Sequence, residues 1–424
     1  MTRTNSNKQN KKSKRKRGGQ PGHSGVTRQL LPETEVDYIE PHFPPENCSC
    51  GGQILLTPDY QRHQVHELPP MALEVTEHQL FQGSCVQCKK HVCASLPQGV
   101  PTGLLGPRLL AFIAVLTSDY TLSKRDITRL LSTLFKLTIS VATVKRAEET
   151  VSQAIQAPVE EAKAYVNQQA IVNCDETSHA QCGKKKWTWV AIADTVAVFL
   201  ITATRSAAAA KALLGAEFTG ILGSDRYSAY SWVSVLCRQV CWAHLKRDFK
   251  KIAERDGKSK AIGLELLACT RQLFDYWHKV RDGTLSRQAF KQAMIPVCRN
   301  VEALLEAGSR VQEAKTRGTC LAILKVKAAL WTFVETAGLE PTNNIAERVL
   351  RKIVLWRKIS FGTWSENGSV YLSRIMSVVA TCRLQKRSTF DFLYHAVEAH
   401  LQGKKAPSLL PNLTSLTTDI ALAA

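Results

Sequence analysis

The chain has 424 residues, of which 44% are hydrophobic, and this length predicts two to four domains with a sizeable core. Its 56 Lys and Arg against 36 Asp and Glu give a net charge of +20, which indicates a polyanionic partner such as nucleic acid. The N-terminus lacks the apolar segment of a signal peptide, and no run approaches the roughly 18 apolar residues of a membrane span, so we expect a cytoplasmic protein without a membrane partner.

Residues 1–25 are predicted to form a basic tail. Eight Lys or Arg lie in the first 17 positions, and no acidic residue is among them. A block of like charges cannot pack, so we expect a disordered segment that binds nucleic-acid phosphates, with a plain solvated tail as the alternative. The densest part of the block supplies the candidate DNA-binding residues Lys14, Arg15, Lys16 and Arg17.

Residues 26–100 predict a small β module that holds zinc. Two close cysteine pairs supply the candidate ligands: Cys48, Cys50, Cys85 and Cys88. Between the pairs, residues 53–56 and 73–81 have the pattern of strands. Paired cysteines in a reduced protein indicate metal, and four thiolates would form a closed structural Zn²⁺ site without a catalytic position. His91 or Cys93 could replace one ligand, and free cysteines are the alternative.

Residues 101–165 are helical by their apolar period. Two predicted helices, at 122–135 and 141–155, are separated by a short break, and such a pair is typical of a helix-turn-helix DNA-binding region. Both predicted helices carry basic residues: Lys124, Arg125, Arg129, Lys145 and Arg146. A helical spacer without DNA contacts is the alternative.

From about residue 166 the pattern becomes that of an α/β domain. Five β-type runs lie at 170–174, 187–193, 197–203, 219–223 and 235–241. An Ala-rich helix at 205–216 separates the third run from the fourth, and the order β-β-β-α-β-β predicts a ribonuclease-H-like sheet. In that sheet the first strand is central and the fourth lies beside it, so their carboxyl ends come together.

Three carboxylates are the candidate catalytic residues of a domain at 166–352. Asp175 and Asp225 follow the first and fourth β-type runs, and Glu347 lies in a predicted helix at 340–352 that Asn343 or Asn344 would cap. Two Asp and one Glu offer the hard oxygen ligands that suit a pair of Mg²⁺ or Mn²⁺ ions. Two such ions support in-line phosphoryl transfer.

Two helical segments complete the predicted domain organisation. Residues 245–335 separate Asp225 from Glu347 and have few strand signals, so we interpret them as a helical insertion into the catalytic domain. Residues 353–424 form a C-terminal helical region.

Other polar residues near the carboxylates are candidates for DNA contacts. Arg348 and Lys352 share one face of the predicted helix, and Arg351 follows closely, so these cations could bind phosphates; a solvated face is the alternative. Cys241 and His244 have the spacing of half a zinc site, with no second half nearby in the sequence. A core cysteine and a hydrogen-bonded histidine are the alternative to a His244 that contacts DNA or orients a carboxylate.

Four segments together resemble the transposases of the insertion-sequence 66 family. They are Cys174-Asp175-Glu176-Thr177, Ser224-Asp225-Arg226-Tyr227, Cys241-Trp242-Ala243-His244-Leu245-Lys246-Arg247 and Thr342-Asn343-Asn344-Ile345-Ala346-Glu347-Arg348. The resemblance implies a DDE-type catalytic core, an N-terminal zinc-binding domain and accessory proteins encoded by the same element. Arg226 stands where the family usually has Gly, and it could face a DNA phosphate. The first cysteine pair is one residue short.

Together these features predict a DNA transposase that nicks the ends of a mobile element and joins them to target DNA. Its partners would be double-stranded DNA, namely the terminal inverted repeats and the target, and it would be nucleoid-associated. Joining two ends needs at least two active sites, so we expect a homo-oligomer on DNA. A structure-specific nuclease on the same fold and a non-catalytic, transposase-derived DNA-binding regulator are the alternatives.

Overall fold

The structure is a computed structural model that describes residues 29–411, so the predicted basic tail with Lys14, Arg15, Lys16 and Arg17 lies outside the described residues. The chain divides into two compact units, one ending at Met71 and the other beginning at Ala72. No helix in the described part of the chain combines the length and the apolar composition that crossing a bilayer requires.

The first unit has little regular structure in its described part. A short 3₁₀ helix spans Glu33–Glu35, and an isolated antiparallel bridge joins Asn47 to Gln53. The strand predicted at 53–56 is wrong, because Gln53 alone makes a bridge. Leu55 and Leu56 are exposed, so this segment has no packed face that would hold a strand.

The second unit begins with a two-stranded hairpin, β1 (Gln82–Ser84) and β2 (His91–Cys93). The strand predicted at 73–81 is wrong, because antiparallel pairing starts only at Gln82. Both strands of the hairpin are exposed, so hydrogen bonding between them, rather than a covered apolar face, defines this element.

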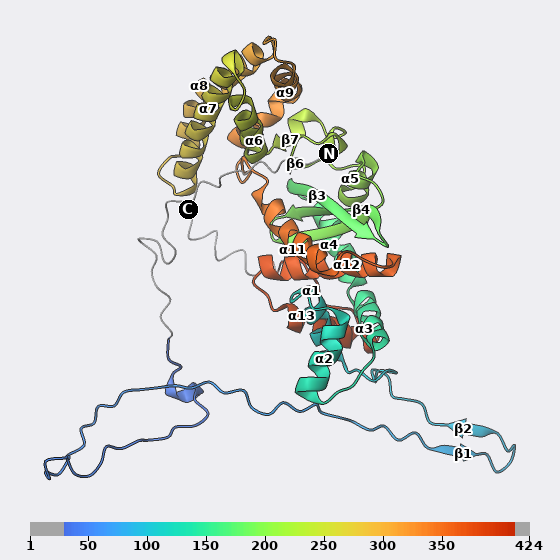
Figure 1. Cartoon of the computed structure of the whole chain (residues 1–424). Coiled ribbons are helices and arrows are strands. Elements are labelled where there is room, and N and C mark those ends of the chain that lie inside the picture. Colours follow the sequence, from blue (N-terminus) through green and yellow to red (C-terminus); the bar gives the residue numbers. More distant parts are fainter. Residues whose placement is uncertain (1–28, 412–424) are drawn as a thin grey trace, which may run out of the picture. The chain divides into compact units, whose positions relative to one another are not determined.

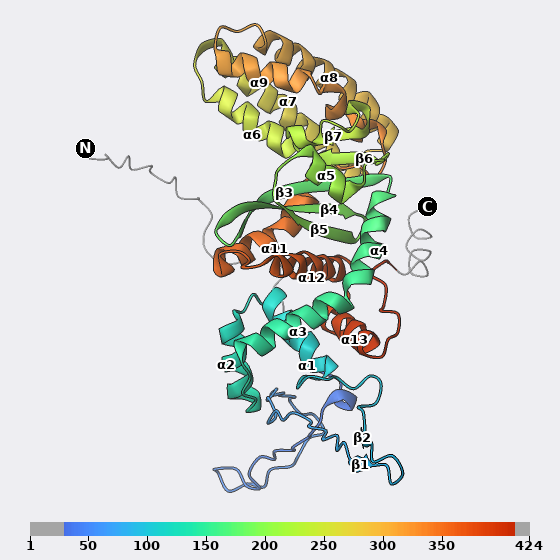
Figure 2. The same ribbon diagram turned by 90° about the vertical axis from the view of Figure 1, so that its right-hand side faces the viewer.

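A five-stranded mixed sheet forms the centre of the second unit (Figures 1 and 2). Its strands are β3 (Ile171–Gln181), β4 (Lys184–Ala193), β5 (Val196–Thr202), β6 (Ile221–Ser224) and β7 (Arg238–Val240). The spatial order is β5-β4-β3-β6-β7, with antiparallel pairs on the β5 side of β3 and parallel pairs on the β7 side. Each predicted β-type run overlaps one of these strands, which confirms the mixed α/β class.

Strand β3 is longer than predicted. It continues to Gln181 because its second half pairs with β4, from Asp175 opposite Val190 to Gln181 opposite Lys184. Asp175 therefore lies inside a strand instead of after its end, which corrects the prediction. Successive side chains of a strand point to opposite faces, so Asp175 and Glu176 serve different sides of the sheet.

Two helices following the sheet in sequence pack against it. Helix α11 (Asn344–Ser360) contacts β3 and β4, and its Arg357 Nη1 donates to Ser178 Oγ at 2.8 Å. Helix α12 (Glu366–Leu384) runs along edge strand β5. Ser377 Oγ accepts a hydrogen bond from Phe199 N at 2.8 Å, so a helix satisfies a backbone group that an edge strand would otherwise expose.

Helices preceding the sheet form a group with the last helix of the chain (Figure 2). The helices before the sheet are α1 (Pro107–Ser118), α2 (Lys124–Phe135), α3 (Val141–Ala154) and α4 (Gln156–Asn167), and the last helix is α13 (Thr389–Leu401). The Arg108 guanidinium of α1 lies 5.2 Å from the Phe390 ring centre and 5.1 Å from that of Tyr394. The helix pair predicted at 122–135 and 141–155 corresponds to α2 and α3.

A second helical group lies between β7 and α11 in sequence and has a hydrophobic core of its own (Figures 1 and 2). Its elements are α6 (Trp242–Ala253), α7 (Gly257–Arg281), α8 (Arg287–Gly308), α9 (Ala314–Leu324), a 3₁₀ helix (Lys327–Leu330) and α10 (Thr332–Glu335). Phe249, Phe290 and Phe333 are fully buried there. Between β5 and β7 lie α5 (Ala207–Leu214) and 3₁₀ turns at Ser228–Tyr230 and Val235–Cys237.

Candidate functional site

The carboxyl ends of the parallel strands bring three site residues into one row. Asn173 pairs with Gly223 in the parallel register of β3 and β6, so Asp175 and Asp225, each two residues further on, occupy matching positions. Neighbouring strands lie about 4.8 Å apart. Cys241 follows β7 in the same way, and its N–H donates to Ser224 O at 2.9 Å. Ligand sites commonly form at such strand ends in α/β sheets.

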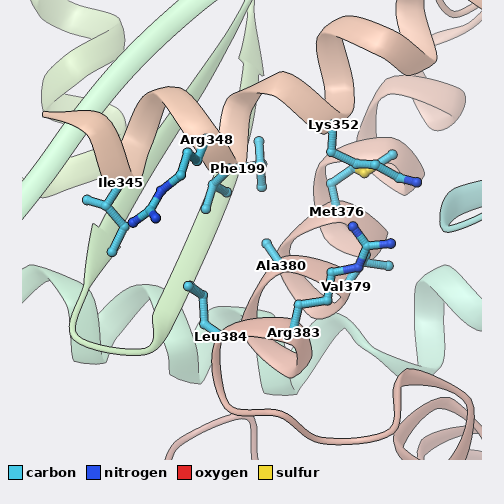
Figure 3. A pocket seen from close by; sticks show the side chains of 10 residues that line it. Phe199, Ile345, Arg348, Lys352, Met376, Val379, Ala380, Arg383 and Leu384 are labelled. Atoms are coloured by element: carbon cyan, nitrogen blue, oxygen red, sulfur yellow. The ribbon is translucent and has the colours of Figure 1, made fainter. Parts of the chain in front are cut away.

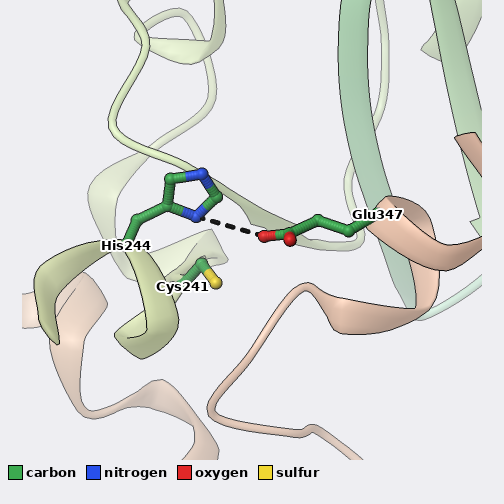
Figure 4. A group of neighbouring side chains, drawn as sticks. All are labelled: Cys241, His244 and Glu347. Atoms are coloured by element: carbon green, nitrogen blue, oxygen red, sulfur yellow. Dashed lines mark ion pairs between the residues drawn. The ribbon is translucent and has the colours of Figure 1, made fainter. Parts of the chain in front are cut away.

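Glu347 enters the same region from the first turn of α11, and two basic side chains contact it. Figure 4 shows one of them, His244. His244 Nδ1 lies 3.5 Å from Glu347 Oε1, and Arg247 Nη2 donates to the same oxygen at 3.2 Å. His244 is in the first turn of α6, so the N-terminal ends of α6 and α11 meet at the site. Partial positive charge at helix N-termini favours anions nearby.

The surroundings of Asp175 and Asp225 suit a bound cation. Burial raises the pKa of Asp175 to about 7, and the negative charges of Glu176, Asp225 and Glu347 add to the rise. No ion pair among residues 29–411 includes Asp175 or Asp225, whose hydrogen bonds come from backbone N–H groups of Glu176 and Tyr227. Hard oxygen donors without a compensating protein cation fit divalent ions such as Mg²⁺.

Asn343 connects three parts of the site. It occupies the predicted N-cap position of α11, but its side chain makes no capping hydrogen bond. Its Nδ2 instead donates to Cys174 O at 2.7 Å, and its backbone N–H donates to Cys241 Sγ at 3.2 Å. These bonds join β3, the end of β7 and the start of α11. Asn343 therefore fixes the start of the helix that carries Glu347. Propensity rules suggest a cap because they consider only local partners.

Glu176 is not among the predicted site residues, yet it has a defined role on the opposite face of β3. Its fully buried carboxylate pairs with Arg205, whose Nε donates at 2.8 Å, and also accepts from Tyr230 Oη. Arg205 stacks 3.6 Å above the Tyr227 ring centre, and Tyr227 N donates to Asp225 Oδ1 at 2.8 Å. Glu176 therefore supports the loop that orients Asp225. Its position beside Asp175 in one short motif is the signal that could have found it.

The predicted DNA-binding residues near the carboxylates have varied surroundings. Arg226 is half-buried and pairs with Asp248 of α6. Arg348 and Arg351 are exposed on α11, and His244 contacts Glu347 as described. Lys352 pairs with Asp119 Oδ1 at 3.7 Å and also donates to the Asp119 carbonyl.

A pocket lies between α11, α12 and β5 (Figure 3). Its volume is about 290 Å³, and Phe199 and Met376 contribute to an apolar wall while Arg348, Lys352 and Arg383 supply positive charge. The shared face of Arg348 and Lys352 is therefore directed toward α12. The expected phosphate contacts of these two residues remain predictions.

The predicted zinc ligands form two tight turns, one in each unit. In the first, Gly51 N donates to Cys48 O at 2.8 Å, and backbone and side-chain hydrogen bonds from Cys50 hold the pKa of the Cys48 thiol below its usual value. In the second, Lys89 N donates to Cys85 O at 2.9 Å, and the Cys88 backbone lowers the pKa of the Cys85 thiol. Each turn favours thiolate, the form that binds Zn²⁺. The four-ligand site itself remains a prediction.

Comparison with known proteins relates the chain to a described family. A family model for the transposase IS66 family matches residues 102–371. Among curated relatives, three uncharacterized proteins of Sinorhizobium fredii are similar. The protein y4jD is 24% identical over 241 residues, which cover 53% of this chain and 46% of y4jD. The protein y4qI is 26% identical over 212 residues, which cover 46% of this chain and 38% of y4qI. The protein y4hP is 24% identical over 396 residues, which cover 83% of this chain and 69% of y4hP. The chain thus spans less than half the length of the first two relatives.

Proposed function

The chain belongs to the IS66 family of transposases, and on that premise we propose that it cleaves the ends of a mobile DNA element and joins them to target DNA. One observation carries the proposal: carboxylates from β3, the end of β6 and the first turn of α11 influence one another at the carboxyl ends of parallel strands. Such a group of oxygens is suited to metal-dependent phosphoryl transfer.

The strand order supports a ribonuclease-H-like catalytic domain at residues 166–352. Three antiparallel strands are followed by two parallel ones, and β3, the first in sequence, is central. The helices from α6 to α10 interrupt this domain between β7 and α11, in agreement with an insertion at about 245–335. Most of their buried side chains form a hydrophobic core of their own, to which β7 contributes Val240.

Asp175, Asp225 and Glu347 would hold two Mg²⁺ or Mn²⁺ ions. When bound, such ions activate an attacking oxygen and stabilise the leaving oxygen during in-line transfer. The protein's part is positioning: β3 and β6 set the spacing of the two Asp side chains, and Asn343 sets the start of the helix that carries Glu347. Tyr227 N holds Asp225 Oδ1 by a 2.8 Å hydrogen bond and leaves its second oxygen available.

The remaining regions would bind DNA and other proteins. The two cysteine turns would share a structural Zn²⁺ ion, and α2 and α3 would contact double-stranded DNA through exposed cations such as Arg125 and Arg146. Arg226, His244, Arg348, Arg351 and Lys352 would contact phosphates nearer the carboxylates. Pairing two element ends requires a homo-oligomer on DNA, and accessory proteins of the same element would take part.

The test is strand cleavage and joining by the purified full chain in Mg²⁺, with DNA carrying the inverted repeats that flank its gene. Asp175→Asn, Asp225→Asn and Glu347→Gln each remove a metal-binding charge at nearly constant shape. We expect both reactions to fall by about 100-fold or more, the scale seen when a group that stabilises transition-state charge is removed. DNA affinity should change by no more than about twofold, as expected for changes that spare the DNA-binding surface.

Asp194→Asn is the matched control, because Asp194 is an exposed carboxylate in the β4–β5 turn, where Asn tolerates the positive φ of 50°. It should cleave and join like the wild type. Full activity of any triad variant would remove that residue from the site. If the chain cleaves DNA but does not join a precut 3′ end, the result favours a structure-specific nuclease. If it binds DNA without cleaving it, the result favours a non-catalytic regulator.

A further inference from the structure

We propose that Cys241, His244 and Glu347 form a second metal site, which is selective for a transition-metal cation of the Zn²⁺ class. Its regulation of catalysis rests on the proposed function. One donor atom from each residue lies within 4.8 Å of the others. Figure 4 shows the three side chains converging from the start of α6 and the start of α11. Among residues 29–411 this is the one group of three or more such side chains that meets this distance.

The donor chemistry distinguishes this site from the carboxylate site. A thiolate and an imidazole select Zn²⁺ and similar ions, whereas Mg²⁺ is bound through oxygen. Zinc bonds of about 2.0–2.3 Å in a tetrahedron put the donor atoms roughly 3.3–3.8 Å apart. Side-chain rotations that move the donor atoms by about 1 Å would therefore bring all three into bonding positions. The fourth position would stay open to water.

The surroundings of Cys241 and His244 favour a bound metal ion. Cys241 is buried, its N–H donates to Ser224 O at 2.9 Å, and its Sγ accepts from Asn343 N at 3.2 Å. His244 Nδ1 is buried and makes no hydrogen bond within the described part of the chain, although Glu347 Oε1 is 3.5 Å away. A buried polar atom without a hydrogen bond needs another partner, and a metal ion would supply it.

Glu347 is the ligand that can exchange partners, and it links the site to catalysis. Its other partner, Arg247, has a 58% exposed side chain, so exchanging that ion pair for a metal bond costs little. A Zn²⁺-class ion would draw the Glu347 carboxylate toward Cys241 and His244 and away from Asp175. The two sites therefore compete for one carboxylate, which makes the soft cation an inhibitor of Mg²⁺-dependent cleavage.

The test uses Co²⁺ as a spectroscopic substitute for Zn²⁺ on the full chain. Other cysteines could also bind Co²⁺, so the readout is the thiolate–Co²⁺ absorption of the wild type minus that of Cys241→Ser. We expect a positive difference band, and we expect Cys241→Ser to bind about one Co²⁺ ion per chain fewer than the wild type, which is the stoichiometry of a single site. His244→Ala and Glu347→Gln should weaken Co²⁺ binding at this site by about tenfold or more. Cys320→Ser, which alters an equally buried thiol in α9, and Asp175→Asn should preserve it.

The site is rejected if Co²⁺ binding is the same in wild type, Cys241→Ser and His244→Ala. Should Cys241→Ser fail to fold, His244→Ala decides, because His244 is partly exposed and its loss spares the core. An unchanged band in Glu347→Gln also overturns the three-ligand site. The proposed function fails separately, through DNA cleavage by Asp175→Asn, a variant in which the Co²⁺ band should persist.

Discussion

Asp175 and Glu176 are adjacent acidic residues, but their side chains lie on opposite faces of β3 and have different surroundings. Arg205 and Tyr230 satisfy the Glu176 carboxylate within the protein. Asp175 has no protein cation and lies beside other carboxylates, so its charge has to be balanced from outside. A carboxylate that the fold leaves unbalanced is the kind of group that binds a metal ion or substrate.

The raised pKa of Asp175 predicts a pH-dependent stability in the absence of metal. Because the folded-state pKa of about 7 exceeds the ordinary 3.8, stability from the protonated group is complete below about pH 4 and is lost as pH rises through about 7. At pH 8 the free energy of unfolding of Asp175→Asn should therefore exceed that of the wild type by up to about 4 kcal/mol. Near pH 4 the two free energies of unfolding should be equal. Urea unfolding across this range measures the difference.

Mg²⁺ supplies a second arm of the same experiment. It should stabilise the wild type more at pH 8 than at pH 5.5, because protons compete with the ion for the carboxylate. Asp194→Asn serves as the control and should follow the wild type at every pH. Parallel curves for wild type and Asp175→Asn would show that Asp175 ionises normally and that its surroundings do not require a cation.

At the scale of elements, helix starts and strand ends form the site together. The middle of β3 and the carboxyl ends of β6 and β7 lie near the first turns of α6 and α11, and Asn343 joins both groups through Cys174 and Cys241. Asp175, His244 and Glu347 thus lie within helices or strands, and Asp225 and Cys241 directly follow β6 and β7. A site held by such elements is more accurately positioned than one carried on loops.

The hairpin of β1 and β2 and the Cys48–Cys50 turn are the elements for which we predict dependence on zinc. Small segments with few buried side chains need a metal to hold them, and residues 29–100 are mostly exposed. Cys48→Ser, Cys50→Ser, Cys85→Ser or Cys88→Ser should each remove about one zinc per chain, as expected for a closed four-ligand site. Metal analysis of the purified full chain provides the measurement.

Cys93→Ser is the informative comparison, since Cys93 is an exposed thiol at the end of β2. Retained zinc in this variant supports the four named ligands. Zinc loss in Cys93→Ser combined with zinc retention in Cys48→Ser would instead assign the fourth position to Cys93.

At the scale of the whole molecule, charge and catalysis are carried by different segments. The net charge of +20 is concentrated in part in the N-terminal block, while the candidate catalytic region gathers carboxylates. A strongly basic segment attracts DNA over long distances and does not need to read bases. Affinity and chemistry should therefore be separable by deletion.

Deleting residues 2–17 should weaken binding to element ends and to random DNA alike. Each phosphate that the tail neutralises contributes roughly 0.9 to the slope of log K against log salt, so the slope should become shallower. Binding isotherms at several salt concentrations measure it. Charge-preserving replacement of Arg3, Arg15 and Arg17 by Lys is the control and should keep the slope. Selective loss of binding to element ends would mean that the tail reads sequence, as a minor-groove arm does.

The sequence by itself determined the elements and the chemical groups, because apolar period and residue type are local properties. It predicted the five β-type runs and the pair α2 and α3, and it named Asp175, Asp225 and Glu347 as candidate metal ligands. Its errors lie where pairing decides the outcome. The segments 53–56 and 73–81 have strand composition but no paired strand, and β3 extends beyond Cys174 because β4 is available beside it.

Only the tertiary structure decided which of these groups meet. The register of β3 with β6 aligns Asp175 with Asp225, and helix packing brings Glu347 to His244 across about a hundred residues of chain, as their 3.5 Å separation records. In the sequence, Cys241 and His244 are half of a metal site without a second half, and Glu347 becomes that half only after folding. Local patterns cannot contain such contacts, since bringing distant segments together depends on the packing of the whole sheet and its helices.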